Sequence, residues 1–259
     1  MRRLYHYTLS APSRAVRFAL AEKGLDFEPR PEEPWQRRPA FLRLNPAGEV
    51  PVLVDEKSTA APRGQQAIPL GEETDPPAPE PTPIDDPNTK GPDEPLAICD
   101  ARTIIDYLDD VYGDAPLAGS SPAARAEARR LWAWFDTKFQ AEVTSLLVSE
   151  KVMKRQMRQG QPDAQAIRAG LHNVSYHLEY VGWLAERRNW LAGDFFSIAD
   201  IAAAAHLSCI DYLDDVPWEK SEAARTWYAR IKSRKGFRAI LSDHVPGLPP
   251  PRHYADPDF

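Results

Sequence analysis

The sequence has very little cysteine. Only Cys99 and Cys209 occur among its 259 residues, which excludes a disulfide framework and favours a reducing, intracellular compartment. Both lie in apolar stretches, where a free thiol behaves as a small hydrophobic side chain. There is no Cys-x-x-Cys pair, and His172 and His177, five residues apart, do not share one helix face. We therefore predict no metal site.

Basic residues do not outnumber acidic ones. The 32 Lys and Arg residues against 38 Asp and Glu give a formal net charge of −6, so no cationic field is available to attract phosphates. Long hydrophobic runs are also absent, since the most apolar one, residues 198–210, is interrupted by Asp200 and His206, and the N-terminus lacks the apolar block of a signal peptide. We predict a cytoplasmic protein with no nucleic-acid partner and no membrane insertion.

Proline is abundant, at 26 residues against 13 glycines. Ten prolines lie in residues 57–95, together with eight acidic residues, three basic residues and no aromatic residue. Such a segment has too little apolar surface to fold, so we predict a disordered acidic insertion. A second proline-rich stretch, 244–259, contains Pro249 to Pro251, which favours an extended polyproline conformation.

The hydrophobic pattern divides the rest of the chain into two parts. In residues 1–113, strand patterns at 4–7, 25–28, 50–54 and 96–99 alternate with helical spacing, including a helix that ends at Gly24 and a helix over 101–112. Ser121-Pro122 is a helix start signal, and only helices follow, at 122–158, 162–188, 197–212, 221–233 and a short one ending near Asp243. We predict an α/β domain with a mixed four-stranded sheet (1–113) and an all-α domain (121–243), followed by an extended tail (244–259).

Four motifs occur in a specific order along these parts. They are Ser10-Ala-Pro-Ser13-Arg-Ala-Val16-Arg17, Asn45-Pro46-Ala47-Gly48-Glu49-Val50-Pro51-Val52-Leu53, Ile98-Cys99-Asp100-Ala101-Arg102-Thr103-Ile104-Ile105-Asp106-Tyr107-Leu108, and Ser197-Ile198-Ala199-Asp200, which also reads as a capping box. In this order they resemble the glutathione transferase family. The resemblance implies a thioredoxin-like domain with a cis peptide bond before Pro51, followed by the helical domain of that family.

The resemblance also implies a glutathione site formed by Ser10, Val50, Pro51, Asp100 and Ala101. A glutathione thiol ionises at neutral pH only with an oriented hydroxyl donor and positive potential nearby. Ser10 is the candidate donor, and Tyr7 is a second hydroxyl close to it. The sequence leaves open the alternative that Ser13 is the helix N-cap and Ser10 only a turn residue.

One motif departs from the family. Asp100-Ala101 occupies the place of the family's Glu-Ser pair, and Ala101 has no hydroxyl for the γ-glutamyl carboxylate. A lost hydrogen bond to a charged group costs about 1.5–3 kcal/mol, or one to two decades of affinity. We therefore expect weak or absent glutathione binding, no catalytic residue and no cofactor. The alternative is a serine-type glutathione transferase that uses Ser10 and Tyr7 and conjugates glutathione to small electrophiles.

The tail alternates aromatic and acidic residues at Tyr254, Asp256, Asp258 and Phe259. Exposed aromatic side chains anchor protein interfaces, so we predict a docking segment; a packed or frayed terminus is the alternative. A transferase-like body without the Glu-Ser pair and with such a tail resembles the transferase-like proteins that bind FtsZ filaments in bacterial cell division. That resemblance implies a non-catalytic homodimeric scaffold whose partner is FtsZ and whose four tail residues contribute to the contact.

Overall fold

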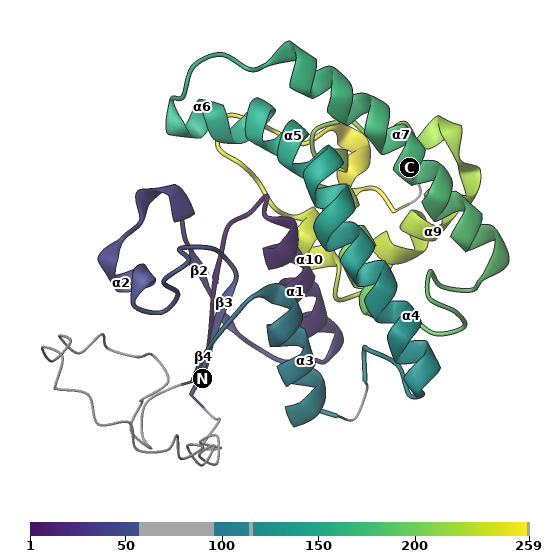
Figure 1. Cartoon of the computed structure of the whole chain (residues 1–259), viewed down its shortest axis with the longest axis horizontal. Helices are drawn as coiled ribbons and strands as arrows, with labels where there is room; N and C mark the ends of the chain where they lie inside the picture. Colours follow the sequence, from purple (N-terminus) through teal and green to yellow (C-terminus); the bar gives the residue numbers. More distant parts are fainter. Residues whose placement is uncertain (57–95, 114–115, 258–259) are drawn as a thin grey trace, which may run out of the picture.

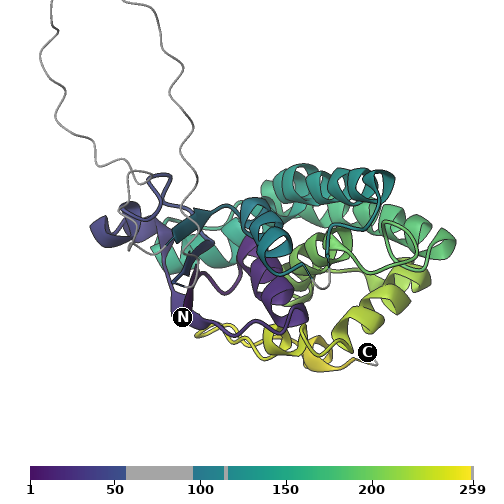
Figure 2. The same cartoon turned by 90° about the horizontal axis from the view of Figure 1, so that it is seen from below.

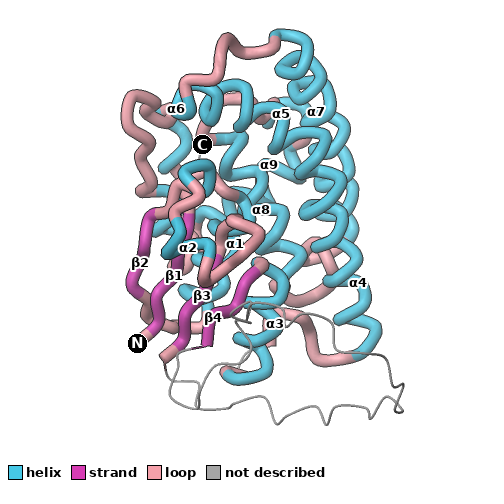
Figure 3. The backbone as a smooth tube through the Cα atoms, turned by 60° about the vertical axis from the view of Figure 1, so that its left-hand side comes forward, coloured by secondary structure: helices cyan, strands magenta, loops and turns pink. Residues whose placement is uncertain are grey.

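The computed structural model describes residues 1–56, 96–113 and 116–257. The predicted insertion at 57–95, as well as Asp258 and Phe259, lie outside the described residues. The first part contains one sheet of strands β1 (Arg2–His6), β2 (Glu28–Pro31), β3 (Val52–Asp55) and β4 (Leu96–Cys99) in the order β2-β1-β3-β4. Figure 3 shows the four strands side by side in this order. β1 is parallel to β2 and antiparallel to β3, which is antiparallel to β4. The prediction of a mixed four-stranded sheet is confirmed.

Strand β2 begins three residues later than the predicted strand at 25–28. The apolar side chains of Leu25 and Phe27 pack against the core, but they do so in the connection that leaves helix α1 (Ala11–Glu22) through Gly24, whose φ is +64°. The paired strand contains Pro29 and Pro31, which an edge strand tolerates. The hydrophobic pattern therefore predicted the connection between α1 and β2 as a strand, instead of the residues that pair with β1.

A short 3₁₀ turn, η1 (Pro34–Gln36), and helix α2 (Pro39–Leu42) connect β2 to β3, and helix α3 (Ala101–Val111) follows β4. The peptide bond between Val50 and Pro51 is cis, as the family resemblance implies.

The second part is helical (Figure 1). Its first helix runs without interruption from Pro122 to Met157, through α4 (Pro122–Ala133), the π-helical η2 (Trp134–Thr144), α5 (Ser145–Val148), the π-helical η3 (Ser149–Met153) and α6 (Lys154–Met157). Then come α7 (Ala164–Arg187), α8 (Ile198–Asp211), the 3₁₀ turn η4 (Trp218–Lys220), α9 (Glu222–Lys232), α10 (Arg238–Leu241) and the 3₁₀ turn η5 (Arg252–Ala255). Every predicted helix is present, because Ser121, Asp163, Ser197 and Ser221 cap their helices with side-chain hydrogen bonds. Among the described residues, no helix is long and apolar enough to cross a membrane.

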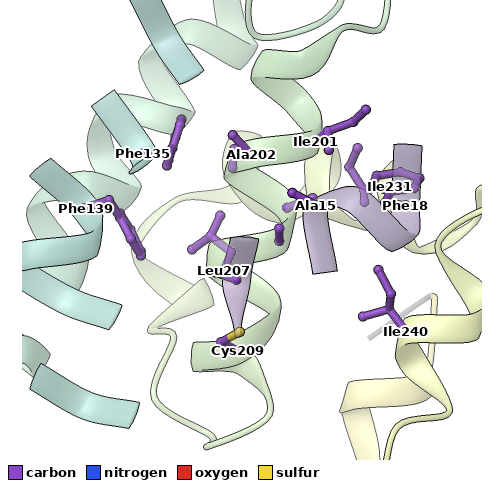
Figure 4. Packing of buried hydrophobic residues seen from close by; sticks show 14 of the residues in the cluster. Ala15, Phe18, Phe135, Phe139, Ile201, Ala202, Leu207, Cys209, Ile231 and Ile240 are labelled. Carbon is purple, nitrogen blue, oxygen red and sulfur yellow. The ribbon is translucent and has the colours of Figure 1, made fainter. Parts of the chain in front are cut away.

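Helix α8 forms the centre of the core. All of its residues are buried, and its alanines allow other helices to approach closely. Figure 4 shows Phe135 and Phe139 of the long helix on one side of α8 and Ala15 and Phe18 of α1 on the other. The two parts of the chain therefore share one core.

The C-terminal segment packs on the body, so the prediction of an extended tail with an exposed Tyr254 is wrong. Tyr254 is 0% exposed, its hydroxyl donates to the carbonyl of Ile240, and its ring lies edge-on to Tyr212 at 5.1 Å. The Lys232 ammonium donates to the carbonyls of His253 and Asp256. Burial of the ring and these hydrogen bonds hold the segment along the body (Figure 2).

Candidate functional site

A cavity of about 580 Å³ lies between the two parts of the chain. It is bounded by the turn before α1, by η1, by the loop before β3, by the start of α3 and by the inner face of the long helix. All six residues predicted for a glutathione site line it: Tyr7, Ser10, Val50, Pro51, Asp100 and Ala101. The cavity therefore brings together six predicted residues that are up to 94 positions apart in the sequence.

Ser10 is the N-cap of α1. Its Oγ accepts a hydrogen bond from the backbone N–H of Ser13 at 3.2 Å, and Ser13 is buried inside the first turn. The alternative that Ser13 caps the helix is therefore wrong. Because the cap uses Ser10 only as an acceptor, its own proton can still be donated to a ligand, at the positive end of the helix dipole.

Tyr7 is engaged elsewhere. Its hydroxyl donates to Oε1 of Gln156 on α6, and its ring packs edge-on against Trp35 at 5.2 Å. Burial raises the pKa of Tyr7 to about 12. The side chain thus connects the first strand to the end of the long helix, and its hydroxyl is not free to activate a thiol.

Asp100 caps helix α3. Its Oδ1 accepts hydrogen bonds from the backbone N–H of Thr103 at 2.9 Å and from the Thr103 hydroxyl at 3.1 Å. The backbone φ of Asp100 is +72°, a region that non-glycine residues rarely occupy. Both the exposed Asp100 and the buried Ala101 that follows it line the cavity.

The long helix contributes a polar wall that the sequence analysis missed. Asp136, Gln140 and Thr144 line the cavity, and they are four residues apart, so they lie on one helix face. A polar stripe at this spacing in an otherwise apolar helix is the signal that could have revealed them. Burial and the charge of Asp100 raise the pKa of Asp136, because both disfavour its ionised form.

The cavity is large enough for a small molecule, but the charge of its wall does not suit glutathione. Among the described lining residues there is no Lys, Arg or His, whereas three are acidic: Glu49, Asp100 and Asp136. Glutathione has two carboxylates and one ammonium and gains another negative charge when its thiol ionises. A site with three acids and no base repels such an anion. Among the described residues there is also no cluster that could hold a metal ion.

Comparison with known proteins agrees with the fold. Residues 9–111 match the family model "Glutathione S-transferase, N-terminal domain", and residues 147–235 match "Glutathione S-transferase, C-terminal domain". The chain is 43% identical to FtsZ-localized protein A of Caulobacter vibrioides over 258 residues, which cover 100% of this chain and 98% of that protein. The chain belongs to the glutathione S-transferase family.

Two solved structures of this family are similar over the full chain. A glutathione S-transferase from Rhodospirillum rubrum F11 is 47% identical with a TM-score of 0.84, and each chain is covered to 100%. FzlA from C. crescentus is 43% identical with a TM-score of 0.84, covering 100% of this chain and 99% of its own. Relatives of this chain thus include a protein named for enzymatic activity and one named for its location on FtsZ.

Proposed function

We propose that this protein is a non-catalytic, homodimeric scaffold that binds FtsZ filaments in bacterial cell division. The observation that carries the proposal is the 43% identity to FtsZ-localized protein A, which extends over the whole chain. Similarity that stopped at the two transferase domains would support only the fold. Here it also covers the C-terminal segment beyond α10.

The charge of the cleft supports the absence of transferase activity. A transferase must hold an anionic tripeptide and stabilise its thiolate. Tyr7 is bound to Gln156, Ala101 has no hydroxyl, and the acids in the cleft oppose both the substrate and its ionised form. Ser10 alone retains a suitable position.

The C-terminal segment remains our candidate for the FtsZ contact, with a changed role for Tyr254. Since its ring is buried, Tyr254 acts as an anchor, and the exposed Asp256 with Asp258 and Phe259 supplies the contact. In a dimer two such ends would engage one filament of repeated subunits, and avidity can raise a weak affinity by about 10²–10⁴.

Cosedimentation with GTP-assembled FtsZ tests this proposal. We expect the full-length protein to pellet with filaments, and a variant lacking residues 257–259 to pellet less, without loss of helical circular dichroism. The matched control is Asp194→Asn, which removes an exposed charge from the connection between α7 and α8. Light scattering should give the mass of two 29.1 kDa chains. No pelleting of the full-length protein excludes FtsZ binding, equal pelleting of the truncated form excludes the C-terminal contact, and a 29.1 kDa particle at micromolar concentration excludes the dimer.

A serine-type glutathione transferase is the second candidate. The position of Ser10 at the N-terminus of α1 favours it, as does the 47% identity to the Rhodospirillum rubrum protein. Isothermal titration with reduced glutathione and a conjugation assay with a general electrophile separate the two functions. Micromolar binding together with turnover that is lost in Ser10→Ala would establish the enzyme and overturn the non-catalytic proposal.

A further inference from the structure

We propose that His253 is a proton-controlled latch on the C-terminal segment, so that this segment opens from the body more often as the pH rises past neutrality. The inference concerns how the segment is held, and it does not depend on FtsZ binding. It rests on the position of the His253 ring between two carboxylates and on the contacts that attach the segment to α8 and α9.

The imidazole of His253 lies between two carboxylates, one from α8 and one from the turn that follows α8. Its Nε2 is 3.0 Å from Asp211 Oδ1, and its Nδ1 is 3.8 Å from Asp214 Oδ1. A neutral imidazole has one N–H group and can donate toward one of these carboxylates, whereas the protonated ring has an N–H group on each nitrogen. The arrangement therefore suits the protonated ring.

Asp211 is the carboxylate that gains most from this proton, because its side chain is 0% exposed. Its Oδ1 also accepts from the indole N–H of Trp218 at 2.8 Å, and the Lys232 ammonium is 3.4 Å from its Oδ2. The same ammonium donates to the carbonyls of His253 at 2.8 Å and Asp256 at 3.2 Å, so Lys232 is shared between the carboxylate and the segment. A hydrogen bond from a charged donor is roughly twice as strong as one from a neutral donor. Loss of the His253 proton therefore weakens the attachment of the segment to α8.

The charges around His253 give the direction of the switch. The hydrogen bond to Asp211 and the charges of Asp211 and Asp214 raise the pKa of His253, burial and the charge of Lys232 lower it, and the net effect is a raised pKa. Within its own segment the charged neighbours Arg252 and Asp256 have opposite signs. In a released segment the imidazole is in water and titrates near 6.5. The docked segment therefore binds the proton more tightly, and the stabilisation that the proton provides is lost as the pH rises above 6.5.

Release is confined to the segment. When His253 loses its proton, Asp211 keeps Trp218 of η4 and Lys232 of α9 as neighbours, and neither belongs to the segment. The ring of Tyr254 is 0% exposed, and its burial keeps the segment docked in most molecules. The proton thus changes the fraction of molecules in which η5 is detached, while the helical core stays folded.

Hydrogen exchange of the full-length protein at pH 6.5 and pH 8.5 tests the proposal. The probes are the amides of Tyr254 and Asp256, which donate to the carbonyls of Pro251 and His253 at 3.1 Å each. After correction for the intrinsic exchange rate at each pH, we expect their opening constant to rise by about threefold or more between the two pH values. The amide of Tyr112, which donates to the carbonyl of Leu108 in the sheet domain, should keep its opening constant.

Two histidine variants identify the group that titrates. His253→Gln keeps an N–H donor but cannot be protonated, so its opening constant should be the same at both pH values. His244→Gln, which changes an exposed histidine of the same segment, is the matched control and should keep the full rise.

An opening constant that does not rise in the natural protein overturns the proposal. A rise that persists in His253→Gln, or that disappears in His244→Gln, overturns it as well, because another group would then be responsible. An equal rise at Tyr112 also contradicts it, since the whole chain and not the segment would then be loosened.

Discussion

At the scale of single residues, Tyr254 determines whether the end of the chain is a free peptide or part of the body. Its ring fills space next to Tyr212, and its hydroxyl donates to a buried carbonyl at 3.1 Å. The sequence showed an aromatic residue among prolines and acids, a pattern typical of docking peptides. It did not show that α8 and α10 leave a site for the ring between Tyr212 and Ile240, because that site forms only when these helices pack together.

We predict that Tyr254→Ala lowers the free energy of unfolding by about 3–5 kcal/mol, the cost of removing a large buried aromatic side chain. Tyr254→Phe keeps the ring and loses one hydrogen bond, so it should cost about 0.5–1.5 kcal/mol. Urea unfolding of both variants measures the difference. Equal effects of the two substitutions would show that the ring contributes nothing, contrary to its burial.

Buried histidines predict a sensitivity to acid. Burial lowers the pKa of His206 to about 3 and that of His6 to about 4, whereas an unfolded histidine titrates near 6.5. Below pH 6.5 the unfolded chain therefore binds protons that the folded chain does not, and stability falls as the pH falls, by about 1 kcal/mol per pH unit for each such histidine. His253 acts in the opposite direction, because its hydrogen bond to Asp211 raises its pKa in the folded chain. Its protonation stabilises the fold below pH 6.5, and this stabilisation is lost as the pH rises above 6.5.

The measurement is urea unfolding at pH 6.5 and pH 5. We expect His206→Gln to lose less stability over this interval than the natural protein, because one of the titrating groups is gone. His172→Gln, which changes an exposed histidine on α7, serves as the control and should keep the full dependence. A pH dependence that is unchanged in His206→Gln would contradict the assignment.

The candidate site was partly predictable at this scale. Motifs local in the sequence identified Ser10, Val50, Pro51, Asp100 and Ala101, and the cavity contains all of them. The N-cap could not be assigned between Ser10 and Ser13, because capping depends on the backbone dihedral angles of the residue. Asp136 was missed since it belongs to another part of the chain and faces Asp100 only after the two parts dock.

At the scale of elements, Gly182 permits a close approach between helices α7 and α9. A Cβ atom at Gly182 would lie 2.1 Å from the Oγ of Ser221, and this same hydroxyl caps α9 by accepting from the N–H of Ala224 at 3.3 Å. The start of α9 therefore packs against Gly182 of α7, where no side chain is present. Any side chain at position 182 has to displace the cap.

We therefore predict that Gly182→Ala destabilises the protein by about 1–3 kcal/mol, although alanine favours a helix by about 1 kcal/mol over glycine. Ser221→Gly removes the obstructing hydroxyl, and glycine costs only a few tenths of a kcal/mol as a cap. The double variant should recover most of the stability in thermal or urea unfolding. If the two substitutions changed the free energy of unfolding additively, the Ser221 hydroxyl would not be the group that an alanine at position 182 clashes with.

Element boundaries were predictable where the signals are local. The helices that begin after Ser121, Ser197 and Ser221 have their caps next to their first turns, and their starts were predicted to within one residue. Strand β2 was misplaced because pairing with β1, not hydrophobicity, decides which residues of an edge segment form the strand. The prediction of an extended C-terminal segment was wrong for the same reason, since the residues that this segment packs against belong to other elements of the fold.

At the scale of the whole molecule, the sheet domain and the helical part are joined by a buried polar network. Arg14 on α1 is 0% exposed; its Nε donates to the carbonyl of Thr8, its Nη1 to the Ser208 hydroxyl at 2.9 Å, and its Nη2 to Asp243. Arg17 forms two further hydrogen bonds of 2.8 Å with the same carboxylate. The two parts can therefore separate only by exposing charged groups together with the face of α8 that packs against α1.

This arrangement predicts that the described parts unfold as one cooperative unit. At constant protein concentration, so that any association is held fixed, hydrogen exchange at the slowest amides of β1 and of α8 should report opening free energies equal within about 1 kcal/mol, the signature of a shared global opening. Arg14→Met should lower the opening free energies of β1 and α8 by the same amount, about 1.5–3 kcal/mol for a charged hydrogen-bonding group, because the Ser208 hydroxyl and the Thr8 carbonyl lose their buried donor.

Arg17→Met is the control for this variant. It removes a more exposed partner of Asp243 and should lower the two opening free energies less. If Arg14→Met lowered the opening free energy of β1 and left that of α8 unchanged, the sheet domain would unfold independently, and a cleft built from both parts would open without unfolding the helical core.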